Sequence, residues 1–371
     1  MKILVDFSQI PVKKVGVGVY AVNTFTTMVR KHNEDVFYFL IQDDDNDFLI
    51  EKKNVVYIAL RAKFFRRFIP RFLMEQFYIP YLCRKYNIDV VHSLHYSFPL
   101  IKTRAQRIVT IHDLTFFLFP KLHTFVKRYY FKWFTKIASS KSDLSLICVS
   151  ESTLADLERL LPNYRSHNYV APLAFGDIPE KVDDNSILEK FGIKGRYVSF
   201  VGTLEPRKNI EGLIKAYHLS RTKSDCKLVI VGKKGWFYDS IFKLVEDLSI
   251  KGRVVFTGFV TDEEKFAIIR NCEVFIYPSF YEGFGLPVLE AMSEGVPVIT
   301  SNISSMPEVG GRAACYVNPN DIEDLAQKID YVVSDQRLRE IMGRNGVEQA
   351  KKFSWDFTAD QTYSVYQKCQ Q

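Results

Sequence analysis

The segment from Tyr281 to Met292 has residue types and spacing that suit an anion-binding helix start. It reads Tyr-Glu-Gly-Phe-Gly-Leu-Pro-Val-Leu-Glu-Ala-Met, follows an apolar run at 274–278, and places seven residues between Glu282 and Glu290. Pro287 suits a first helical turn, and the glycines before it leave backbone N–H groups exposed. Unpaired N–H groups and the helix dipole both favour an anion there. Each glutamate alone has an ordinary explanation, a helix-start charge or a solvated loop residue, but their joint occurrence with the glycines and the proline indicates a site.

A pair of cations forms the second candidate. Arg207 and Lys208 lie in the stretch Gly-Thr-Leu-Glu-Pro-Arg-Lys-Asn at 202–209, between an apolar run and a predicted helix at 210–217. Two adjacent cations at such a place can neutralise a diphosphate without a metal ion. Taken alone, the pair would be read as an ordinary surface pair.

The elements that must position these residues alternate between apolar strands and amphipathic helices. In the first half we predict strands at 2–6, 36–41, 54–58, 90–92, 107–112 and 145–150, with helices near 19–29, 75–86, 126–139 and 153–161. In the second half we predict strands at 197–202, 227–232, 253–258, 274–278 and 298–300. Continuous apolar strands separated by helices are typical of parallel sheets covered on both faces.

Three strands of the second half run into a glycine, namely Gly202, Gly232 and Gly258. Backbone or ligand must therefore approach closely at the carboxyl edge of this sheet, where open α/β sheets bind their ligands. The 371 residues suit two domains. We place one Rossmann-like domain at 1–175, a second at 187–354, and an amphipathic helix at 355–371 that returns to the first domain.

The 202–209 stretch together with the Glu282-x7-Glu290 pattern resembles the retaining GT-B glycosyltransferases of family 4, which include many bacterial mannosyltransferases. The resemblance covers nearly the whole chain and is strongest from about 197 to 322. It implies an α/β fold of two doubly wound, Rossmann-like, parallel-sheet domains facing across a cleft. Under this resemblance 1–175 would be the acceptor domain, 187–354 the nucleotide-sugar-binding domain, and the helix at 355–371 would cross the cleft. It also implies retaining transfer of a hexose from a nucleotide-diphosphate sugar, without a metal ion or other cofactor.

The resemblance assigns roles to particular residues. Glu290 would bind the donor ribose, and Glu282 would hold the transferred sugar. Arg207 and Lys208 would bind the diphosphate and stabilise the charge that grows as it leaves. The remaining donor-binding set of the second domain consists of Gly202, Gly258, Val260, Gly283, Phe284, Gly285 and Leu286.

The first domain supplies further candidates under the same resemblance. Gly16 and Gly18 lie in a predicted loop before a helix, where such enzymes place a glycine-rich loop near donor phosphate and acceptor. His112 ends a predicted strand at the cleft edge and would contact the donor sugar as a catalytic residue. A strand-end histidine with a purely structural hydrogen bond is the alternative, and His92 and His95 are more simply read as packing residues.

The resemblance favours GDP-mannose as the donor and a saccharide or lipid-linked glycan as the acceptor, in cell-surface polysaccharide synthesis. The acidic run Asp43–Asp47 contains the Asp-x-Asp spacing that other glycosyltransferases use for a metal. It lies far from the donor motif, so we predict a solvated acidic turn. The six cysteines include no C-x-x-C pair, which argues against structural zinc.

Charge is unevenly distributed along the chain. Residues 51–150 contain 18 Lys or Arg but 5 Asp or Glu, within a net charge of +7 for the chain. Segments 63–74 and 126–134 interleave these cations with bulky apolar residues, which favours an anionic membrane surface over nucleic acid, for which no motif is present. Aromatics that pack the core beneath a basic outer face are the alternative. With no leader and no apolar run long enough to span, we expect a cytoplasmic protein peripheral to the inner face of the membrane.

Three other functions remain open at this point. Gly16-x-Gly18-x-x-Ala21 imitates the dinucleotide fingerprint of NAD-dependent oxidoreductases, although the gap from Asp6 is too long for its tight first turn. A sugar-nucleotide epimerase of the same fold would leave the nucleotide attached to its product. A non-catalytic membrane adaptor would not need both glutamates and the Arg207–Lys208 pair.

Overall fold

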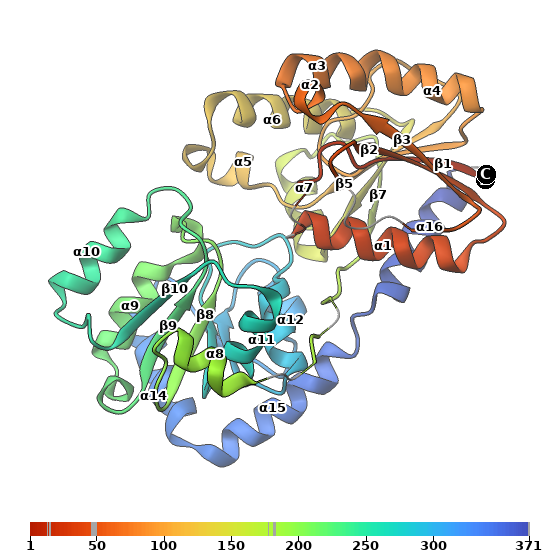
Figure 1. Cartoon of the computed structure of the whole chain (residues 1–371). Coiled ribbons are helices and arrows are strands. Elements are labelled where there is room, and N and C mark those ends of the chain that lie inside the picture. The colour runs from red at the N-terminus through yellow and green to blue at the C-terminus, as the bar shows by residue number, and fades with distance from the viewer. Residues whose placement is uncertain (13, 15, 46–49, 177, 181–182, 370–371) are drawn as a thin grey trace. The chain divides into compact units, whose positions relative to one another are not determined.

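The computed structural model describes residues 1–371 except 13, 15, 46–49, 177, 181–182 and 370–371. The chain divides into two compact units, Met1–Gly176 with Ser354–Gln371, and Asp177–Phe353. Each unit contains its own parallel sheet covered by helices (Figure 1). The predicted α/β class with two Rossmann-like sheets is therefore confirmed.

The first unit has a seven-stranded sheet in the order β3-β2-β1-β4-β5-β6-β7, and every pairing is parallel. Its strands are β1 (Lys2–Asp6), β2 (Val36–Gln42), β3 (Val55–Leu60), β4 (Val90–Ser93), β5 (Gln106–Ile111), β6 (Leu144–Cys148) and β7 (His167–Val170). The sequence prediction contained six of these and missed β7, a four-residue edge strand without a continuous apolar run.

Helices cover both faces of this sheet because its side chains alternate between them. In β2, Tyr38 and Leu40 belong to the cluster formed with α4, whereas the Phe39 ring meets Phe25 of α1 from the other face, with centroids 6.1 Å apart. The longer helices of the unit are α1 (Val17–Lys31), α4 (Ile79–Tyr86), α6 (Phe125–Ser139), α7 (Glu151–Leu160) and α16 (Trp355–Lys368), with the short α5 (Thr115–Leu118) and η2 (Pro120–Leu122) before α6.

The helix predicted at 75–86 begins earlier and is not regular. It is preceded by α2 (Ala62–Phe65) and α3 (Phe68–Leu73), and a π-helical turn, η1 (Met74–Tyr78), joins α3 to α4. Within η1 the side chains of Glu75 and Gln76 are buried, while those of Phe77 and Tyr78 are exposed. One continuous helical segment thus presents polar groups inward and aromatic groups outward.

The last helix, α16, packs on α1 and makes hydrogen bonds to residues in and beside the first sheet. The Tyr366 hydroxyl lies 2.6 Å from Nδ1 of the buried His92, and the Tyr363 hydroxyl donates to Asp35 at 2.6 Å. His92 Nε2 is bonded to Thr110 at 2.8 Å, so both ring nitrogens have protein partners. His92 therefore ties α16 to the sheet, which agrees with its interpretation as a packing residue.

The second unit has a six-stranded parallel sheet in the order β10-β9-β8-β11-β12-β13. Its strands are β8 (Tyr197–Val201), β9 (Lys227–Val231), β10 (Val254–Gly258), β11 (Val274–Tyr277), β12 (Val298–Ser301) and β13 (Cys315–Val317). Its helices are α8 (Asp184–Lys190), η3 (Pro206–Lys208), α9 (Ile210–Leu219), η4 (Arg221–Ser224), α10 (Asp239–Asp247), α11 (Asp262–Arg270), α12 (Leu286–Ser293), α13 (Met306–Gly310), α14 (Ile322–Ser334) and α15 (Gln336–Ala350). The prediction missed β13, which has only three residues.

Both sheets reverse their strand order at one point. In the first sheet the reversal lies between β1 and β4, and in the second it lies between β8 and β11. Ligands of open α/β sheets bind outside the carboxyl ends of the strands at such switch points. The loops that follow β1, β4, β8 and β11 are therefore the places to examine for chemistry.

Candidate active site

The loop between β11 and α12 has a backbone that requires glycine at its end. Gly285 is the N-cap of α12 and has φ of 117°, in the region that side-chain-bearing residues rarely adopt. A β-carbon on Gly285 would also lie 2.3 Å from Cε of Met306, which would have to turn away. Pro287 occupies the first turn of α12, as the sequence predicted.

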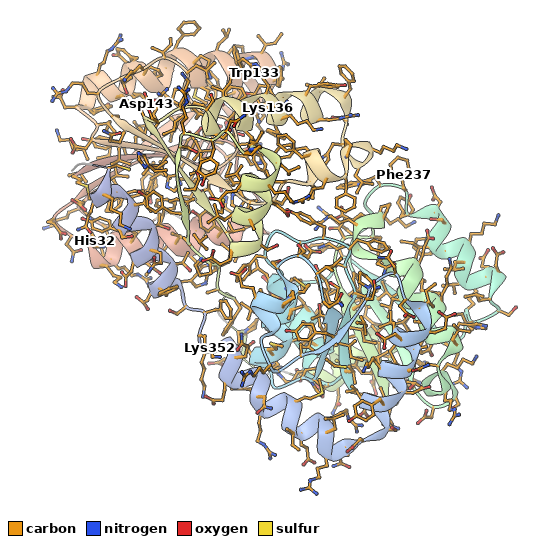
Figure 2. The ribbon with its side chains drawn as sticks, turned by 180° about the vertical axis from the view of Figure 1, so that it is seen from behind. His32, Trp133, Lys136, Asp143, Phe237 and Lys352 are labelled. Carbon is orange, nitrogen blue, oxygen red and sulfur yellow. The ribbon has the colours of Figure 1, made fainter. Side chains whose placement is uncertain are left out.

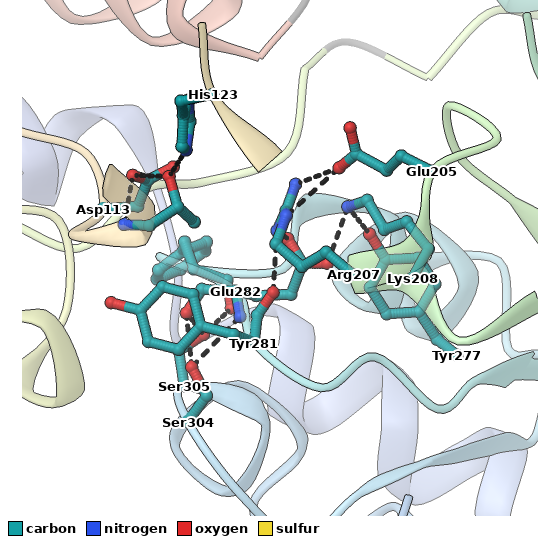
Figure 3. Close-up of polar contacts among 12 residues, drawn as sticks. Asp113, His123, Glu205, Arg207, Lys208, Tyr277, Tyr281, Glu282, Ser304 and Ser305 are labelled. Carbon is teal, nitrogen blue, oxygen red and sulfur yellow. Dashed lines mark hydrogen bonds and ion pairs between the residues drawn. The ribbon is translucent and has the colours of Figure 1, made fainter. Parts of the chain in front are cut away.

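Glu282 lies in this loop and is the centre of a buried ion cluster (Figure 3). Its Oε2 accepts from Nη1 of Arg207 at 2.7 Å, and its Oε1 accepts from Nζ of Lys208 at 2.6 Å. Lys208 Nζ also donates to the Tyr277 hydroxyl at 2.6 Å, and Arg207 Nη1 to the Tyr281 carbonyl at 2.7 Å. Since Arg207 and Lys208 follow β8 while Glu282 follows β11, the cluster spans the switch point of the second sheet.

Neighbouring charges decide the protonation of this cluster. Burial alone raises the pKa of the Glu282 carboxyl, but the charges of Arg207 and Lys208 outweigh it and hold that pKa at about 2. For Lys208, burial and the adjacent Arg207 charge lower the pKa, and Glu282 partly restores it. Glu282 is therefore ionised at neutral pH, and it compensates the two cations.

A second carboxylate, Glu205, also binds the arginine. Its Oε1 accepts from Nη2 of Arg207 at 2.7 Å and from Nε at 3.1 Å, and its side chain is buried. The sequence interpretation treated Arg207 and Lys208 as two cations available to a diphosphate. The structure shows that two carboxylates already balance those two charges, and the role of Glu205 was not predicted from the sequence.

Two serines hold the glycine-rich loop and were missed as well. Ser304 donates to the Glu282 carbonyl at 2.5 Å and accepts from its N–H at 3.1 Å. The buried Ser305 hydroxyl lies 3.0 Å from the same carbonyl and 2.5 Å from that of Phe284. Ser304 has φ of 58°. The Ser-Ser-Met-Pro-Glu sequence signals only the start of α13, so its bonds to a loop 21 to 23 residues earlier were not predictable from it.

Glu290 pairs with a different cation from those that pair with Glu282. It lies on α12, and its Oε1 accepts from Nζ of Lys265 on α11 at 2.8 Å. Burial tends to lower the pKa of Lys265, but Glu290 and Asp262 outweigh that effect and raise it. The two glutamates of the motif thus have separate partners, and Lys265 is a residue of the site that sequence reasoning did not identify.

At the ends of β9 and β10, the space beside each glycine shows whether neighbouring backbone fills it or it stays open to a ligand. A β-carbon on Gly232 would lie 1.8 Å from the carbonyl oxygen of Gly202, so the backbone itself fills that space. Around Gly258, which has φ of 73°, no described atom beyond its two chain neighbours lies within 4 Å of such a β-carbon. Phe259, the next residue, is about half exposed at 49%, and Val260 is partly buried.

The first unit places its predicted residues at the carboxyl edge of its own sheet. His112 follows β5 and donates from Nε2 to the Leu94 carbonyl at 2.9 Å, and burial lowers its pKa despite that bond. The ring is therefore neutral at pH 7, with Nδ1 as its acceptor. Gly16, with φ of 51°, is the N-cap of α1. The placement of Gly18 in a loop is wrong, because Gly18 is buried in the first turn of that helix.

The acidic run at 43–47 is not simply solvated. Asp45 is fully buried and accepts from Nζ of Lys14 at 2.5 and 2.6 Å. Asp43 accepts from the Ala62 N–H at 2.9 Å, and Asp44 is paired with Arg66. The prediction of a solvated turn is therefore wrong for Asp45, because Lys14 compensates its burial. Asn46 and Asp47 lie outside the described residues.

One group of potential metal ligands occurs elsewhere in the described part of the chain. His32, Glu34 and Asp35 lie between α1 and β2 with ligand atoms within 4.8 Å of one another. Asp35 already accepts from the Tyr363 hydroxyl and pairs with the amino group of Met1, and the His32 ring stacks on Tyr363. These contacts account for the group as part of the packing of α16.

Both halves of the chain match known glycosyltransferase families. The family model described as "Glycosyl transferases group 1" matches residues 183–349, and the "Glycosyltransferase Family 4" model matches residues 15–172. The chain is 35% identical over 290 residues to O-antigen chain mannosyltransferase B of Escherichia coli, which covers 76% of this chain and 75% of that protein. The chain belongs to the family 4 glycosyltransferases. Neither an epimerase nor an oxidoreductase is favoured by these matches.

Solved structures agree on the fold of this glycosyltransferase. Sucrose-phosphate synthase from Thermosynechococcus elongatus superimposes with a TM-score of 0.77 at 20% identity, covering 99% of this chain and 98% of that one. Anabaena HepE in complex with UDP-glucose gives a TM-score of 0.73 at 17% identity, covering 99% and 100%. The expected GT-B fold is therefore confirmed.

Proposed function

We propose that this glycosyltransferase moves a mannosyl group from GDP-mannose to a saccharide or lipid-linked glycan acceptor, with retention of configuration, in cell-surface polysaccharide synthesis. The observation that carries the proposal is the Arg207–Lys208–Glu282 cluster at the switch point of the second sheet. The choice of mannose is supported by the relative at 35% identity, which is an O-antigen chain mannosyltransferase.

The donor would lie along the loops that follow β8, β10 and β11. Glu290 would bind the ribose hydroxyls, the Gly258–Val260 segment would line the base, and the N–H groups at the start of α12 would face the sugar and phosphate. Glu282 would accept hydrogen bonds from the transferred sugar while keeping its two cations. Lys265 would hold the Glu290 carboxylate in one orientation, because it is bonded to it at 2.8 Å.

The diphosphate would compete with Glu205 for the Arg207 guanidinium. Charge develops on the leaving diphosphate while the sugar becomes oxocarbenium-like. A guanidinium already fixed by Glu282 and the Tyr281 carbonyl is preorganised for that charge and needs little rearrangement. The acceptor would enter on the face that the diphosphate leaves, and a phosphate oxygen would take its proton. We therefore assign neither a protein base nor a metal ion to the reaction.

The test is a thermal-shift and turnover panel with GDP-mannose, GDP, UDP-glucose and UDP, each with and without EDTA. A ligand at 100 times its Kd adds about 2.7 kcal/mol of stability. We expect stabilisation and turnover with GDP-mannose, unchanged in EDTA, and an α-linked product by NMR. Stabilisation by UDP-glucose alone would refute GDP-mannose as the donor. A product of inverted configuration would refute the retaining mechanism. Activity that is lost in EDTA and restored by Mn²⁺ would refute the metal independence.

We also propose that the first unit contacts an anionic membrane at the cytoplasmic face. Within the described residues, no helix is long and apolar enough to span a membrane. Instead, the segment from α3 to α4 exposes Ile69, Leu73, Phe77 and Tyr81 at four-residue spacing, with Ile69 67% and Phe77 61% exposed. Residues four apart lie on one face of a helix, so these side chains form a continuous apolar stripe.

Helix α6 extends this surface. It exposes Phe125 at 75%, Tyr129 at 50% and Trp133 at 49%, and Trp133 and Lys136 are marked in Figure 2. The ring of Tyr130 on α6 lies 5.1 Å from that of Phe68 on α3, which places the two helices side by side. Core packing therefore accounts for part of the aromatic residues, such as Phe72 and Phe131, but not for this outer set.

Cations border the apolar stripe. The exposed cations are Lys63 on α2, Arg67 at the N-cap of α3, and Arg84 and Lys85 in the last turn of α4. Arg66 is paired with Asp44, and Arg71 is partly buried, where its charge acts on the carboxyls of Asp6 and Glu75. Exposed cations attract anionic headgroups at about 1 kcal/mol each, while the aromatic rings enter the interface.

Liposome co-sedimentation tests this surface. The wild type should bind phosphatidylglycerol-containing vesicles, and binding should weaken as salt rises. Changing Lys63, Arg67 and Arg84 together to Glu should abolish it. Lys194, Lys215 and Lys243, exposed on the second unit, give a control variant with the same change in charge. Equal recovery of the wild type with neutral and anionic vesicles, or equal loss in both variants, would refute the proposal.

A further inference from the structure

A second buried polar cluster lies at the switch point of the first sheet. The loop after β1 contributes Gln9, the loop after β4 contributes Ser97, and the π-helical turn η1 contributes Glu75. Glu75 is completely buried and Ser97 is also buried, whereas Gln9 is partly exposed. This is the position at which an open α/β sheet binds a ligand, and none of these residues has a role in the donor site.

The three side chains form one directed network. The Ser97 hydroxyl donates to Oε2 of Glu75 at 2.8 Å, and Nε2 of Gln9 lies 2.9 Å from that hydroxyl and 3.4 Å from the same Glu75 oxygen. The amide nitrogen of Gln9 therefore points inward, and its carbonyl oxygen Oε1 points the other way. Among the described residues, none donates a hydrogen bond to Gln9 Oε1, which leaves an oriented acceptor for a ligand hydroxyl.

A purely structural role in fixing the loop after β4 does not explain why a carboxyl group is buried at Glu75. Its neighbour Gln76 already does this, donating from Nε2 to the Phe98 carbonyl at 3.1 Å and accepting from the Leu100 N–H at 2.8 Å. Glu75 adds a buried carboxyl close to a second one, Asp6, which costs free energy. It is also placed by a π-helical turn, a rare geometry that is frequent at functional sites.

We propose that Gln9, held in orientation by Ser97 and Glu75, binds a hydroxyl group of the acceptor saccharide through its Oε1 atom. The inference rests on the proposed function, in which the second unit holds the donor and leaves the first for the acceptor. Gln9 is the contact residue, and Glu75 and Ser97 are positioning residues. The membrane-facing stripe belongs to the same helical segment as Glu75, so a lipid-linked acceptor would meet both.

Ligand binding by this network should depend on pH, which a purely structural set of hydrogen bonds would not predict. Burial, followed by the charge of Asp6, raises the pKa of Glu75 to about 8, while Ser97 and Arg71 lower it less. Tyr130 of α6 faces the same group, and burial raises the pKa of its phenol and of the Asp6 carboxyl. Below pH 8 Glu75 is neutral. Above it, the ionised carboxylate accepts from both Ser97 and Gln9 and fixes the amide.

The experiment separates acceptor binding from donor chemistry in the full-length enzyme. For Gln9→Ala, Glu75→Gln and Ser97→Ala, the measurements are acceptor KM, donor KM, kcat, melting temperature and the slow hydrolysis of GDP-mannose by water without acceptor. Gln361→Ala on α16, whose side chain makes no hydrogen bond among the described residues, is the matched control. We expect Gln9→Ala to raise acceptor KM roughly tenfold. At pH 9, where Glu75 is ionised, Glu75→Gln and Ser97→Ala should raise it by about 3- to 10-fold, with donor KM and hydrolysis unchanged in all three variants.

The pH profile provides a second readout. Wild-type acceptor KM should fall as pH rises through about 8, and Glu75→Gln should remove that change. An unaltered acceptor KM in Gln9→Ala, or equal losses in acceptor use and hydrolysis, would overturn the inference while leaving the glycosyltransferase assignment intact. Absence of both hydrolysis and transfer in the wild type would instead refute the proposed donor and, with it, this inference.

Discussion

Replacing Glu282 with glutamine removes the charge that compensates Arg207 and Lys208 while preserving the shape of the side chain. The cluster lowers the carboxyl pKa from its ordinary value of 4.5 to about 2. A difference of this size between the folded and unfolded chain corresponds to about 3 kcal/mol of stability at neutral pH. It agrees with the roughly 3–5 kcal/mol that is lost when one partner of a buried ion pair is removed.

The sign of the pH dependence follows from the lowered pKa. Above about pH 4.5 the carboxyl is ionised in both the folded and unfolded chain, so the contribution is complete. As pH falls from 4.5 towards 2, the unfolded chain takes up the proton first and the contribution is lost. The stability difference between wild type and Glu282→Gln should therefore shrink to less than half its neutral value near pH 3.

The assay is thermal unfolding followed by circular dichroism at pH 7 and pH 3. For a unit of this size, about 3 kcal/mol corresponds to a decrease of about 6–12 °C in melting temperature at pH 7. Glu263→Gln, an exposed position on α11, is the control and should shift it by less than about 1 °C. A shift under about 2 °C in Glu282→Gln, or an equal shift at both pH values, would refute the electrostatic account of the cluster.

Five other substitutions test the remaining contacts. Arg207→Ala and Lys208→Ala should each lower kcat/KM for the donor by roughly 10- to 100-fold, since under the proposed function each removes a charge-assisted partner of the diphosphate; unchanged steady-state kinetics would contradict this. Glu290→Gln should raise donor KM about tenfold with little change in kcat, because ribose binding is the same in ground and transition states, and an effect confined to kcat would speak against it. Lys265→Met should likewise raise donor KM, and a calorimetric titration with GDP should show weaker binding than in the wild type. Gly232→Ala should destabilise by at least about 3 kcal/mol, because its β-carbon would enter the Gly202 carbonyl oxygen; a melting temperature close to that of the wild type would show that the backbone can yield.

Local patterns were sufficient to predict the fold class and the main motif. Continuous apolar strands are specified by their own residues, because both faces of a parallel sheet are buried whatever the partner strand is. The helix start at Pro287 and the glycines at the strand ends are likewise local requirements of the backbone. The exceptions, β7 and β13, are short edge strands whose conformation depends on a neighbouring strand more than on their own sequence.

Tertiary structure alone decided how the charges are paired. Ion pairs form between residues that are distant in the chain and leave no periodic signal in the sequence. The sequence therefore could not show which carboxylates pair with Arg207, or that Lys265 pairs with Glu290 and Lys14 with Asp45.

The same reason applies to Glu75, which sequence reasoning treated only as the start of a helix. Its burial and its bond to Ser97 depend on a π-helical turn and on the loop after β4, neither of which has a signal in the sequence. Sequence determined which residues carry charge and which backbone positions need glycine. Only the folded chain determined which charges are buried together, because burial and compensation are properties of the packed neighbours.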